Sequence, residues 1–484
     1  MKMTMKQKSP KNVIIGRKAE QQLLKDYINS PRAEMIAVYG RRRVGKTYLI
    51  RNFFNDKFDF YMTGMYKMGM RDQLQMFADR LSKYAGHPVK RPKNWFRAFE
   101  MLRDYLMHLP KRRWIVFIDE LPWLDTPKSK FFSALEAFWN LWGSNQPQLK
   151  LIVCGSATSW MINKLLGDKG GLHNRVTHRL RLCPFTLAEV ETYLKYNGIN
   201  WDRMQVLQCY MVMGGVPYYL SQLNRRESLT QNIDRLFFGK MAELREEYAF
   251  LFRSLFQNSV LYQRVAELLA AKPQGLTRAE IIHALKLSSG GGVSEVLENL
   301  CRCDIAQKFA TFGMTVRQTR YRLADNYVAF YLHFVKDNNS HNSRAWREMK
   351  DQKRSAWYGH AFELVCFAHI DQIKRALGIP GIESSVYGWS YRAKNEGEKG
   401  AQIDLLIERA DRIINLCEMK YSIVPFELTG DYYQRMVERR ELFRTITHTP
   451  YTLQLTMVTT MGLKDGKYTG NIASQVDLDD LFTD

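Results

Sequence analysis

The chain contains one stretch whose residue types and spacing are those of a phosphate-binding loop. Residues 40–47 read GRRRVGKT, which matches the pattern G-x-x-x-x-G-K-[ST]. Gly40 and Gly45 allow the backbone to turn tightly after an apolar run, so that successive N–H groups point at a phosphate at a helix N-terminus. By its place in the pattern, Lys46 reaches the β- and γ-phosphates of a nucleotide and Thr47 is a ligand of Mg²⁺.

A second pair of candidates follows a nearly continuous apolar run that ends in Asp119 and Glu120. Such a run is typical of a central parallel strand that is covered on both faces. Ligands of parallel sheets bind at the carboxyl ends of the strands, so these acids are expected beside the phosphate loop. We expect Asp119 in the Mg²⁺ shell and Glu120 at the water that attacks the phosphate.

Four further positions each allow two interpretations. Ser156 either senses the γ-phosphate or the water, or caps a helix. Arg175 is either an arginine finger or an ordinary surface arginine. The lead-in with Gly16 and Arg17 either wraps over the adenine or caps a helix. Pro217 lies in a glycine-containing break that either approaches the adenine or is a plain turn between helices.

The last part of the chain carries a third group of acids. Glu363 lies in a helical segment, Asp404 lies near the start of one strand of a predicted hairpin, and Glu418 and Lys420 lie two residues apart on the second strand. Carboxylates that hold Mg²⁺ beside a lysine that positions water are the arrangement of a metal-dependent nuclease. Asp404 reaches Glu418 only if the hairpin splays at that point.

Apolar patterning around these groups predicts the elements that position them. Short apolar runs are expected to be buried strands with helices between them, at residues 35–39, 58–63, 113–120, 149–154 and 178–183.

Residues from 259 to 335 predict three helices and a hairpin, which is the pattern of a winged helix-turn-helix. Its third helix, within residues 290–299, carries two glutamates and neither lysine nor arginine. A DNA reader and a module that joins neighbouring domains therefore both remain open.

Composition limits the class of protein. The 484 residues carry a net charge of +22 with a pI near 9.6, which favours a polyanionic partner such as nucleic acid, although solubility alone would also explain it. Seven cysteines without paired metal-ligand spacing fit a reducing compartment. The basic N-terminus lacks a signal-peptide apolar region, and the sequence lacks a run of membrane-spanning length. We expect a cytoplasmic protein with no membrane association.

The motifs together resemble the archaeal-type ATPase family in the STAND branch of AAA+ P-loop NTPases. The resemblance rests on the loop, the strand that ends in Asp119 and Glu120, residues 154–156, and residues 215–217. The C-terminal part resembles the restriction-endonuclease-like domain of the PD-(D/E)XK type, and the two resemblances cover nearly the whole chain from Ile14.

The resemblance implies a multidomain α/β protein that uses ATP and Mg²⁺. Its implied parts are a basic tail (1–12), a P-loop AAA+ ATPase core (13–183), a helical lid (184–255), a winged helix (256–335), a linker (336–350) and a PD-(D/E)XK nuclease-like domain (351–484).

The resemblance also implies roles for individual residues. Gly16 and Arg17 would line the adenine side, Pro217 would lie near the base, and Arg175 would act on the γ-phosphate, in trans if the chain forms a homo-oligomer. The implied nuclease residues are Asp404, Glu418 and Lys420, with Glu363 as an additional metal ligand. The chain departs from the family's Pro-Asp pair, because residues 402–404 read Gln-Ile-Asp.

The sequence favours an ATP-dependent switch whose C-terminal domain binds DNA and cleaves it with Mg²⁺. Two alternatives stay open. One is a signalling or assembly ATPase whose nuclease-like fold is a non-catalytic module for a protein client or nucleic acid. The other is a transposition-type helper ATPase, which would need a separate recombinase.

Overall fold

The computed structural model divides the chain into two compact units, Met1–Cys183 and Pro184–Asp484. Each unit has its own sheet and its own hydrophobic cores. The expectation of a multidomain α/β protein is therefore confirmed. The structure describes residues 13–156, 160–166, 175–256, 258–288, 290–313, 318–338, 342–393 and 400–483.

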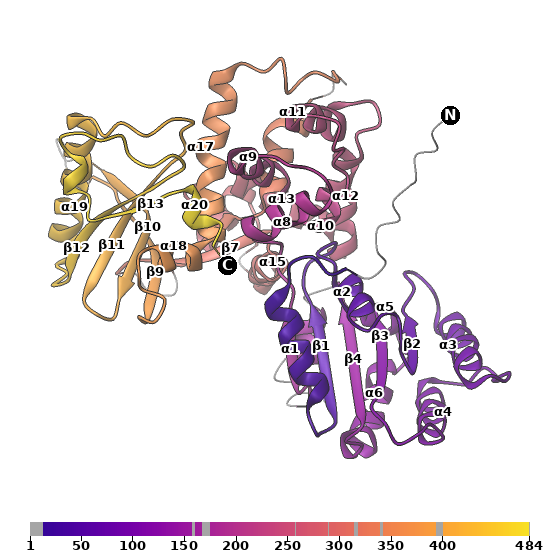
Figure 1. The fold of residues 1–484 in the computed structure, drawn as a ribbon. Coiled ribbons are helices and arrows are strands. Elements are labelled where there is room, and N and C mark those ends of the chain that lie inside the picture. The colour runs from indigo at the N-terminus through magenta and orange to yellow at the C-terminus, as the bar shows by residue number, and fades with distance from the viewer. Residues whose placement is uncertain are drawn as a thin grey trace. The chain divides into compact units, whose positions relative to one another are not determined.

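The described residues of the first unit form a five-stranded parallel sheet with the strand order β2-β3-β4-β1-β5 (Figure 1). All the runs predicted to be strands are strands, with ends that differ by at most two residues. Because the sheet is parallel, the carboxyl ends of its strands meet at one edge. The strands are β1 (Glu34–Tyr39), β2 (Phe60–Thr63), β3 (Trp114–Asp119), β4 (Leu149–Gly155) and β5 (His178–Arg181).

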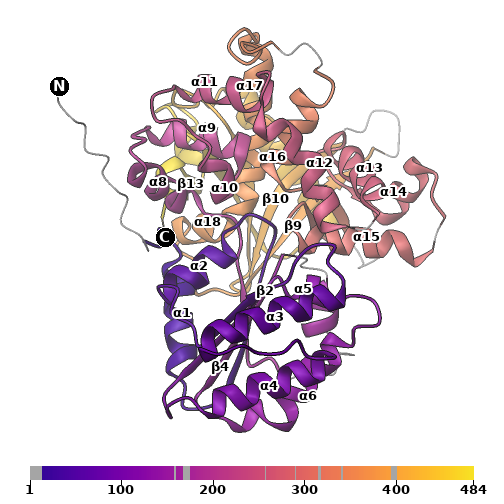
Figure 2. The same cartoon turned by 90° about the vertical axis from the view of Figure 1, so that its right-hand side faces the viewer.

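Helices cover both faces of this sheet (Figures 1 and 2). Side chains alternate between the two faces of a strand, so Ile36 and Val38 of β1 join a core with α1 and α2, while Met35 and Ala37 join a core with α3, α4 and α6. The helical segments of this unit are α1 (Lys18–Asn29), α2 (Lys46–Phe53), α3 (Met70–Ala85), α4 (Trp95–Met107), α5 (Leu121–Leu124), α6 (Phe131–Leu141), η1 (Gly143–Asn145) and η2 (Met161–Leu166).

The second unit begins with a group of helices whose first member is fixed by a histidine far along the chain. The N–H of Leu187 donates to His369 Nε2 at 3.0 Å, and His369 Nδ1–H donates to the carbonyl of Val365 at 2.8 Å. Burial lowers the pKa of His369 to about 4. The helices of this group are α8 (Leu187–Tyr196), α9 (Arg203–Met213), α10 (Pro217–Leu220), α11 (Leu229–Ile233), η3 (Asp234–Phe238) and α12 (Glu243–Leu255).

The glycine-containing break after α9 has a packing reason. A Cβ on Gly215 would lie 1.9 Å from the carbonyl oxygen of Phe185, and the N–H of Phe185 donates to the Gly215 carbonyl at 2.6 Å. Only glycine allows two backbone segments to approach this closely. The break therefore joins the start and the end of the α8–α9 pair.

Three helices and a hairpin follow, in the order that the sequence predicted. β7 and β8 pair antiparallel, and the short β6 pairs with β8. Thr277 caps α14 through a reciprocal pair of hydrogen bonds with Glu280, which is a common N-terminal signal of a helix. The elements are α13 (Ser259–Ala270), β6 (Leu276–Thr277), α14 (Arg278–Leu285), α15 (Gly291–Arg302), β7 (Ala306–Thr311) and β8 (Arg320–Leu323).

The hairpin belongs to the same sheet as the C-terminal strands. The sheet has the order β13-β12-β11-β10-β9-β7-β8-β6, and β7 pairs parallel with β9 through Ala310 opposite Tyr387 and Thr311 opposite Gly388. The N–H of Phe312 extends the contact by donating to the Gly388 carbonyl at 2.9 Å. The remaining strands are β9 (Ser384–Tyr391), β10 (Ala401–Arg409), β11 (Ile413–Lys420), β12 (Thr452–Thr459) and β13 (Ser474–Val476).

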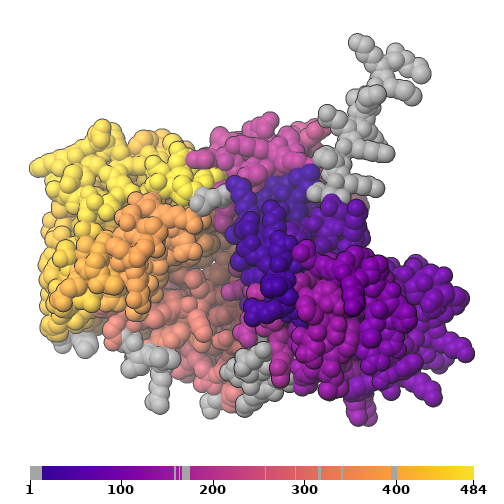
Figure 3. All heavy atoms as spheres, turned by 60° about the horizontal axis from the view of Figure 1, so that its bottom comes forward, coloured from indigo at the N-terminus to yellow at the C-terminus, as the bar shows by residue number. Residues whose placement is uncertain are grey.

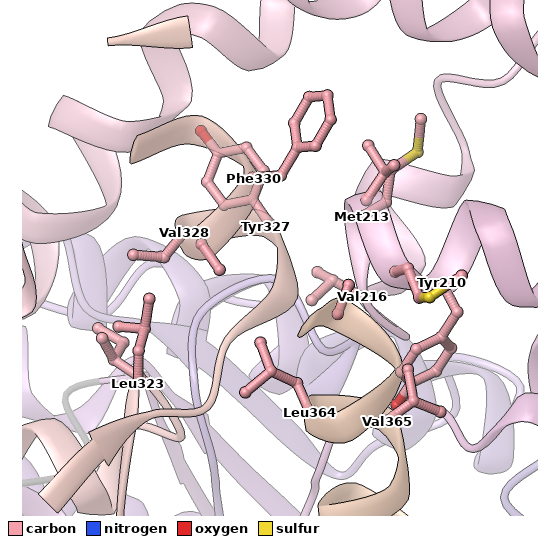
Figure 4. Packing of buried hydrophobic residues seen from close by; sticks show 14 of the residues in the cluster. Tyr210, Met213, Val216, Leu323, Tyr327, Val328, Phe330, Leu364 and Val365 are labelled. Carbon is pink, nitrogen blue, oxygen red and sulfur yellow. The ribbon is translucent and has the colours of Figure 1, made fainter. Parts of the chain in front are cut away.

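Helices α9, α16 and α17 share one large core, which Figure 4 shows around Tyr210, Tyr327 and Leu364. In the space-filling view of Figure 3, the orange segment around α18 and β9 packs directly against the yellow C-terminal segment. The helical segments of this part are α16 (Asn326–Phe330), η5 (Tyr331–Val335), α17 (Asp351–Ala368), α18 (Ile370–Ala376), α19 (Gly430–Thr447), η6 (Thr469–Asn471) and α20 (Leu478–Leu481).

The segment predicted to be a polar linker, 336–350, contains a buried anchor. Trp346 is 1% exposed and packs against Phe330 and Phe334. The backbone N–H of Trp346 donates to the buried carboxylate of Asp234 at 2.8 Å, and Arg347 forms an ion pair with the same carboxylate at 2.7 Å. These contacts fix the described part of the segment to the helical group that precedes it.

None of the helices in the described parts of the chain combines the length and the apolar character that crossing a membrane requires. The seven cysteines are all thiols.

Candidate functional site

The predicted phosphate loop lies between β1 and α2. Gly40 has φ +149°, and a Cβ there would lie 2.2 Å from the carbonyl oxygen of Leu182. Gly45 has φ +90° and precedes the first residue of α2. Both positions need the freedom of glycine, one for close approach and one for the left-handed turn into the helix. The loop therefore leads directly into the N-terminus of α2, as the pattern predicted.

The lysine and threonine of the loop face the inside of the turn. Lys46 is 5% exposed, and its Nζ donates to the carbonyls of Gly40 and Arg41 at 2.9 and 2.8 Å. Thr47 Oγ1 donates to Asp119 Oδ2 at 2.8 Å. The structure thus places the loop and the end of β3 in direct contact.

Glu120 follows Asp119 in a left-handed conformation with φ +45°. Its N–H donates to Asp119 Oδ1 at 2.9 Å, and its own Oε2 accepts a hydrogen bond from Ser156 Oγ at 2.9 Å. Conformations of this kind are uncommon for residues other than glycine and occur often at functional sites. The hydrogen bond from Ser156 holds the Glu120 carboxylate in place, a role that the sequence did not predict.

The lead-in before α1 also contacts the loop. Arg17 is 4% exposed and has φ +56°, next to Gly16 with φ +66°. Its Nη2 donates to the carbonyl of Val44 at 3.3 Å, and its Nη1 lies 3.2 Å from Glu20 Oε1. Arg17 thus ties the lead-in to the phosphate loop.

Two predicted residues are not among these contacts. Arg175 is exposed ahead of β5, and no hydrogen bond that the described residues form around the loop involves it. Pro217 is the first residue of α10 and belongs to the second unit, so the geometry of the first unit leaves its predicted role untested.

The second group of predicted residues gathers around the end of the β10–β11 hairpin. The ladder between the two strands stops at Leu405 opposite Cys417, and the pairing of β10 with β9 changes register between Ile403 and Leu406. β10 therefore leaves the ladder at Asp404, while β11 stays paired with β12. The splay that sequence reasoning required at Asp404 is present.

The charge of Asp404 acts on the carboxyl group of Glu363. Burial, followed by the negative charge of Asp404, raises the pKa of Glu363 to about 7. Lys420 and Arg322 act in the opposite direction and Glu418 in the same one. The predicted acids and lysine therefore share one electrostatic environment, which Arg322 joins from β8.

Glu418 is surrounded by donors that sequence reasoning missed. Its Oε1 lies 3.2 Å from Lys420 Nζ and accepts a hydrogen bond from the Tyr432 hydroxyl, and its Oε2 lies 2.9 Å from Arg439 Nη1. Lys420 and Arg439 lower the pKa of Glu418. Tyr432 and Arg439 come from α19, and neither belongs to a motif that would mark it in the sequence.

The predicted set of metal ligands is not gathered into a shell. Within the part of the chain that the structure describes, no three His, Cys, Asp or Glu side chains stand close enough together to hold a metal ion. Both oxygens of Glu418 are engaged by Lys420, Tyr432 and Arg439 instead. Asp404 Oδ1 also accepts a hydrogen bond from Gln402 Nε2.

Comparison with known proteins supports the assignment of the first unit. Residues 15–223 match the family model of an ATPase domain found predominantly in Archaea. These residues are therefore similar to an ATPase domain, and the match spans the phosphate loop, Asp119, Glu120 and Ser156.

Two proteins of Methanocaldococcus jannaschii are similar in sequence. An uncharacterised protein is 24% identical over 400 residues, which cover 81% of this chain and 84% of that protein. An uncharacterised ATP-binding protein is 44% identical over 45 residues, which cover 9% of this chain and 76% of that protein.

Two solved structures are similar in part. A Walker-type ATPase of Pyrococcus abyssi is 17% identical with a TM-score of 0.48, over 66% of this chain and 96% of that chain. The ORC2 protein of Aeropyrum pernix, in ADPNP and ADP complexes, is 15% identical with a TM-score of 0.39, over 66% of this chain and 95% of that chain.

Proposed function

We propose that the first unit binds and hydrolyses ATP and thereby switches the state of the second unit. The observation that carries the proposal is the direct hydrogen bond from Thr47 to Asp119, at 2.8 Å, beside the buried Lys46. It brings the phosphate loop and the carboxyl end of β3 together, and ATPases of this class need both at the triphosphate.

The residues present fit both ATP and Mg²⁺. The Thr47 hydroxyl and the Asp119 carboxylate are oxygen donors of the kind that Mg²⁺ prefers, and they would hold the ion between them. The ion would supply positive charge at the β- and γ-phosphates. The Lys46 ammonium and the backbone N–H groups at the start of α2 would bind the phosphates themselves.

Glu120 would orient the attacking water, and Ser156 would hold Glu120 in place for that task. The hydrogen bond from Ser156 Oγ fixes one carboxylate oxygen and leaves the other for the water. Gly16 and Arg17 would lie on the adenine side, and Pro217 near the base. Arg175 would act on the γ-phosphate, either within one chain or from a second copy.

Nucleotide binding and turnover separate these roles. Lys46→Ala is expected to abolish binding of a fluorescent ATP analogue, whereas Glu120→Gln is expected to bind ATP and to lose hydrolysis. Lys57→Ala is a matched control because Lys57 is an exposed lysine beyond α2. Unchanged turnover in Glu120→Gln would refute the role of Glu120, and unchanged binding in Lys46→Ala would refute the nucleotide site.

A second candidate function is Mg²⁺-dependent cleavage of nucleic acid by the second unit. It is favoured by the splay of the hairpin at Asp404 and by the cavity that Glu363 and Asp404 both line. Glu363 and Asp404 would hold Mg²⁺, and Glu418 would join them only by exchanging its present partners Lys420, Tyr432 and Arg439. The ion would supply positive charge at the phosphodiester. Lys420 would position the water.

A nicking assay tests this candidate. Supercoiled and single-stranded DNA and RNA are incubated with Mg²⁺ or Mn²⁺, with and without ATP, and Asp404→Asn and Lys420→Ala are expected to lose cleavage. Glu408→Gln is a matched control, because Glu408 lies on the same strand as Asp404 within the intact ladder. If the wild type cleaves no substrate, the second unit is a non-catalytic module, as in the signalling or helper ATPase alternatives.

A further inference from the structure

The second unit contains a cavity of about 1100 Å³ between the β7–β8 hairpin, helix α17 and strands β9 and β10. Its volume slightly exceeds that of typical small-molecule pockets, which measure about 300–1,000 Å³. Glu363 and Asp404 line it together with residues of the hairpin. The cavity exists because β7 pairs with β9, which brings the hairpin beside the proposed nuclease residues.

Arginines line this cavity from strand β8 and from the residue that follows strand β9. Arg320 and Arg322 are two residues apart on β8 and therefore share one face, and Arg392 follows β9. Arg320 is held by the Gly275 carbonyl at 2.9 Å and by Glu280 at 3.4 Å. Arg392 is exposed, so it is available to a ligand that enters from solvent.

Arg322 is the unusual member of this group. It is 6% exposed, and its Nη2 donates to Gln307 Oε1 at 3.0 Å. Its Nε is buried and has no hydrogen-bond acceptor among the described residues. Burial lowers the pKa of Arg322 to about 9, so it remains charged at neutral pH. The negative charges of Asp404 and Glu363 act on Arg322 against the effect of burial, and its unused Nε donor can pair with a further anion.

Aromatic rings frame this arginine. The Arg322 guanidinium lies 3.1 Å from the ring centroid of Phe367 and 4.6 Å from that of Phe309. Phe309 itself fits between two glycines, since a Cβ on Gly275 or Gly388 would lie 2.9 Å from its ring. Glycine in both neighbouring segments therefore leaves the room that the Phe309 ring occupies.

Further rings extend the lining along β9. Trp389 and Tyr391 line the cavity with their rings nearly parallel and the ring centroids 6.5 Å apart. Phe312 also lines it and contacts the rings of Tyr387 and Phe443. Cations interleaved with aromatic faces are the combination that binds single-stranded nucleic acid, because phosphates pair with arginine and unstacked bases stack on rings. In a duplex the faces of the bases are covered by neighbouring bases, so duplex bases cannot stack on these rings.

We infer that this cavity binds a short stretch of single-stranded nucleic acid, with phosphates on Arg322 and Arg392 and bases on the aromatic lining. The inference rests on the proposed nuclease function and specifies its substrate class. A strand in the cavity passes the Glu363–Asp404 pair, so the substrate is a single strand, a flap or an unpaired end. The net charge of +22 draws such a strand to the chain.

Binding is measured without cleavage, in EDTA and without ATP. The readout is the fluorescence anisotropy of a labelled 12-nucleotide single strand and of the matching duplex. Arg392→Gln and Arg322→Gln are each expected to weaken single-strand binding about tenfold and to lower the salt slope by about one. Arg226→Gln is the control, because it removes an exposed arginine of the same unit that does not line the cavity. Circular dichroism checks the fold of Arg322→Gln.

Equal affinity for duplex and single strand would overturn the inference, as would unchanged affinity in the exposed Arg392→Gln variant. Preference for the single strand, with loss in both cavity variants and retention in Arg226→Gln, supports it. Failure of the nuclease proposal alone looks different: the wild type then binds the single strand in EDTA but never cleaves it when Mg²⁺ or Mn²⁺ is supplied.

Discussion

Replacing His369 should remove a pH dependence from the stability of the second unit. His369 is neutral in the fold, because its Nε2 accepts the N–H of Leu187 and its Nδ1–H donates to Val365. Protonation would place a second donor against the Leu187 N–H in a buried site. Burial and this conflict are consistent with a pKa of about 4 for His369 in the fold, against about 6.5 for a solvated histidine.

The sign and size follow from linkage. The unfolded chain binds a proton near pH 6.5 and the folded chain only near pH 4, so the contribution is complete above about pH 6.5 and falls as pH decreases toward 4. Between pH 7 and pH 5 the second unit should lose about 1.8 kcal/mol, which is about a 20-fold rise in its opening constant.

Hydrogen exchange followed by mass spectrometry measures that constant in peptides that cover the start of α8 and the end of α17. His369→Gln keeps an acceptor for Leu187 but does not titrate, so its opening constant should change much less with pH. His448→Asn is the control, because His448 is an exposed histidine of the same unit. An equal pH dependence in the wild type and in His369→Gln would refute the reasoning.

Three further predictions concern two glycines that leave room for neighbouring atoms and one buried carboxylate. Gly40→Ala should weaken nucleotide binding at least tenfold in a fluorescence titration, because its Cβ would lie 2.2 Å from a carbonyl oxygen; retained affinity would mean that the loop can shift. Asp59→Ala should lower the free energy of unfolding of the first unit by about 2 kcal/mol, because the buried Asp59 carboxylate accepts the N–H of Ile115 at 2.8 Å. Calorimetry of the wild type and the variant measures this difference, and equal unfolding transitions would contradict it. Gly388→Ala should displace Phe309, whose ring lies 2.9 Å from the added Cβ, and weaken single-strand binding, whereas unchanged anisotropy would show that Phe309 is not a platform.

The sequence predicted the elements of the first unit well because its signals are local. The phosphate loop and the acids after β3 are each recognisable within a few residues of an apolar strand, and parallel pairing then brings their ends together. The contact between Thr47 and Asp119 followed from that rule alone. The hydrogen bond from Ser156 to Glu120 did not, because it depends on the left-handed turn at Glu120.

The second site was predictable only in part. The splay at Asp404 was a stated condition, and the Glu418–Lys420 pair followed from the alternation of side chains along a strand. Arg322 and Arg439 were missed, since Arg322 reaches the acids through the pairing of β7 with β9, and Arg439 comes from a helix after the hairpin. Such contacts between distant segments leave no periodic pattern in the sequence.

The pairing of β7 with β9 also decides how this protein can be dissected. A truncation within 336–350 looks convenient from the sequence, but it would expose an open strand edge on each fragment. A cut before Trp346 would also separate it from Phe330 and Phe334. Exposed edges invite pairing with other chains. Fragments cut there should therefore aggregate when expressed separately and recover when coexpressed. The second unit should accordingly be expressed whole.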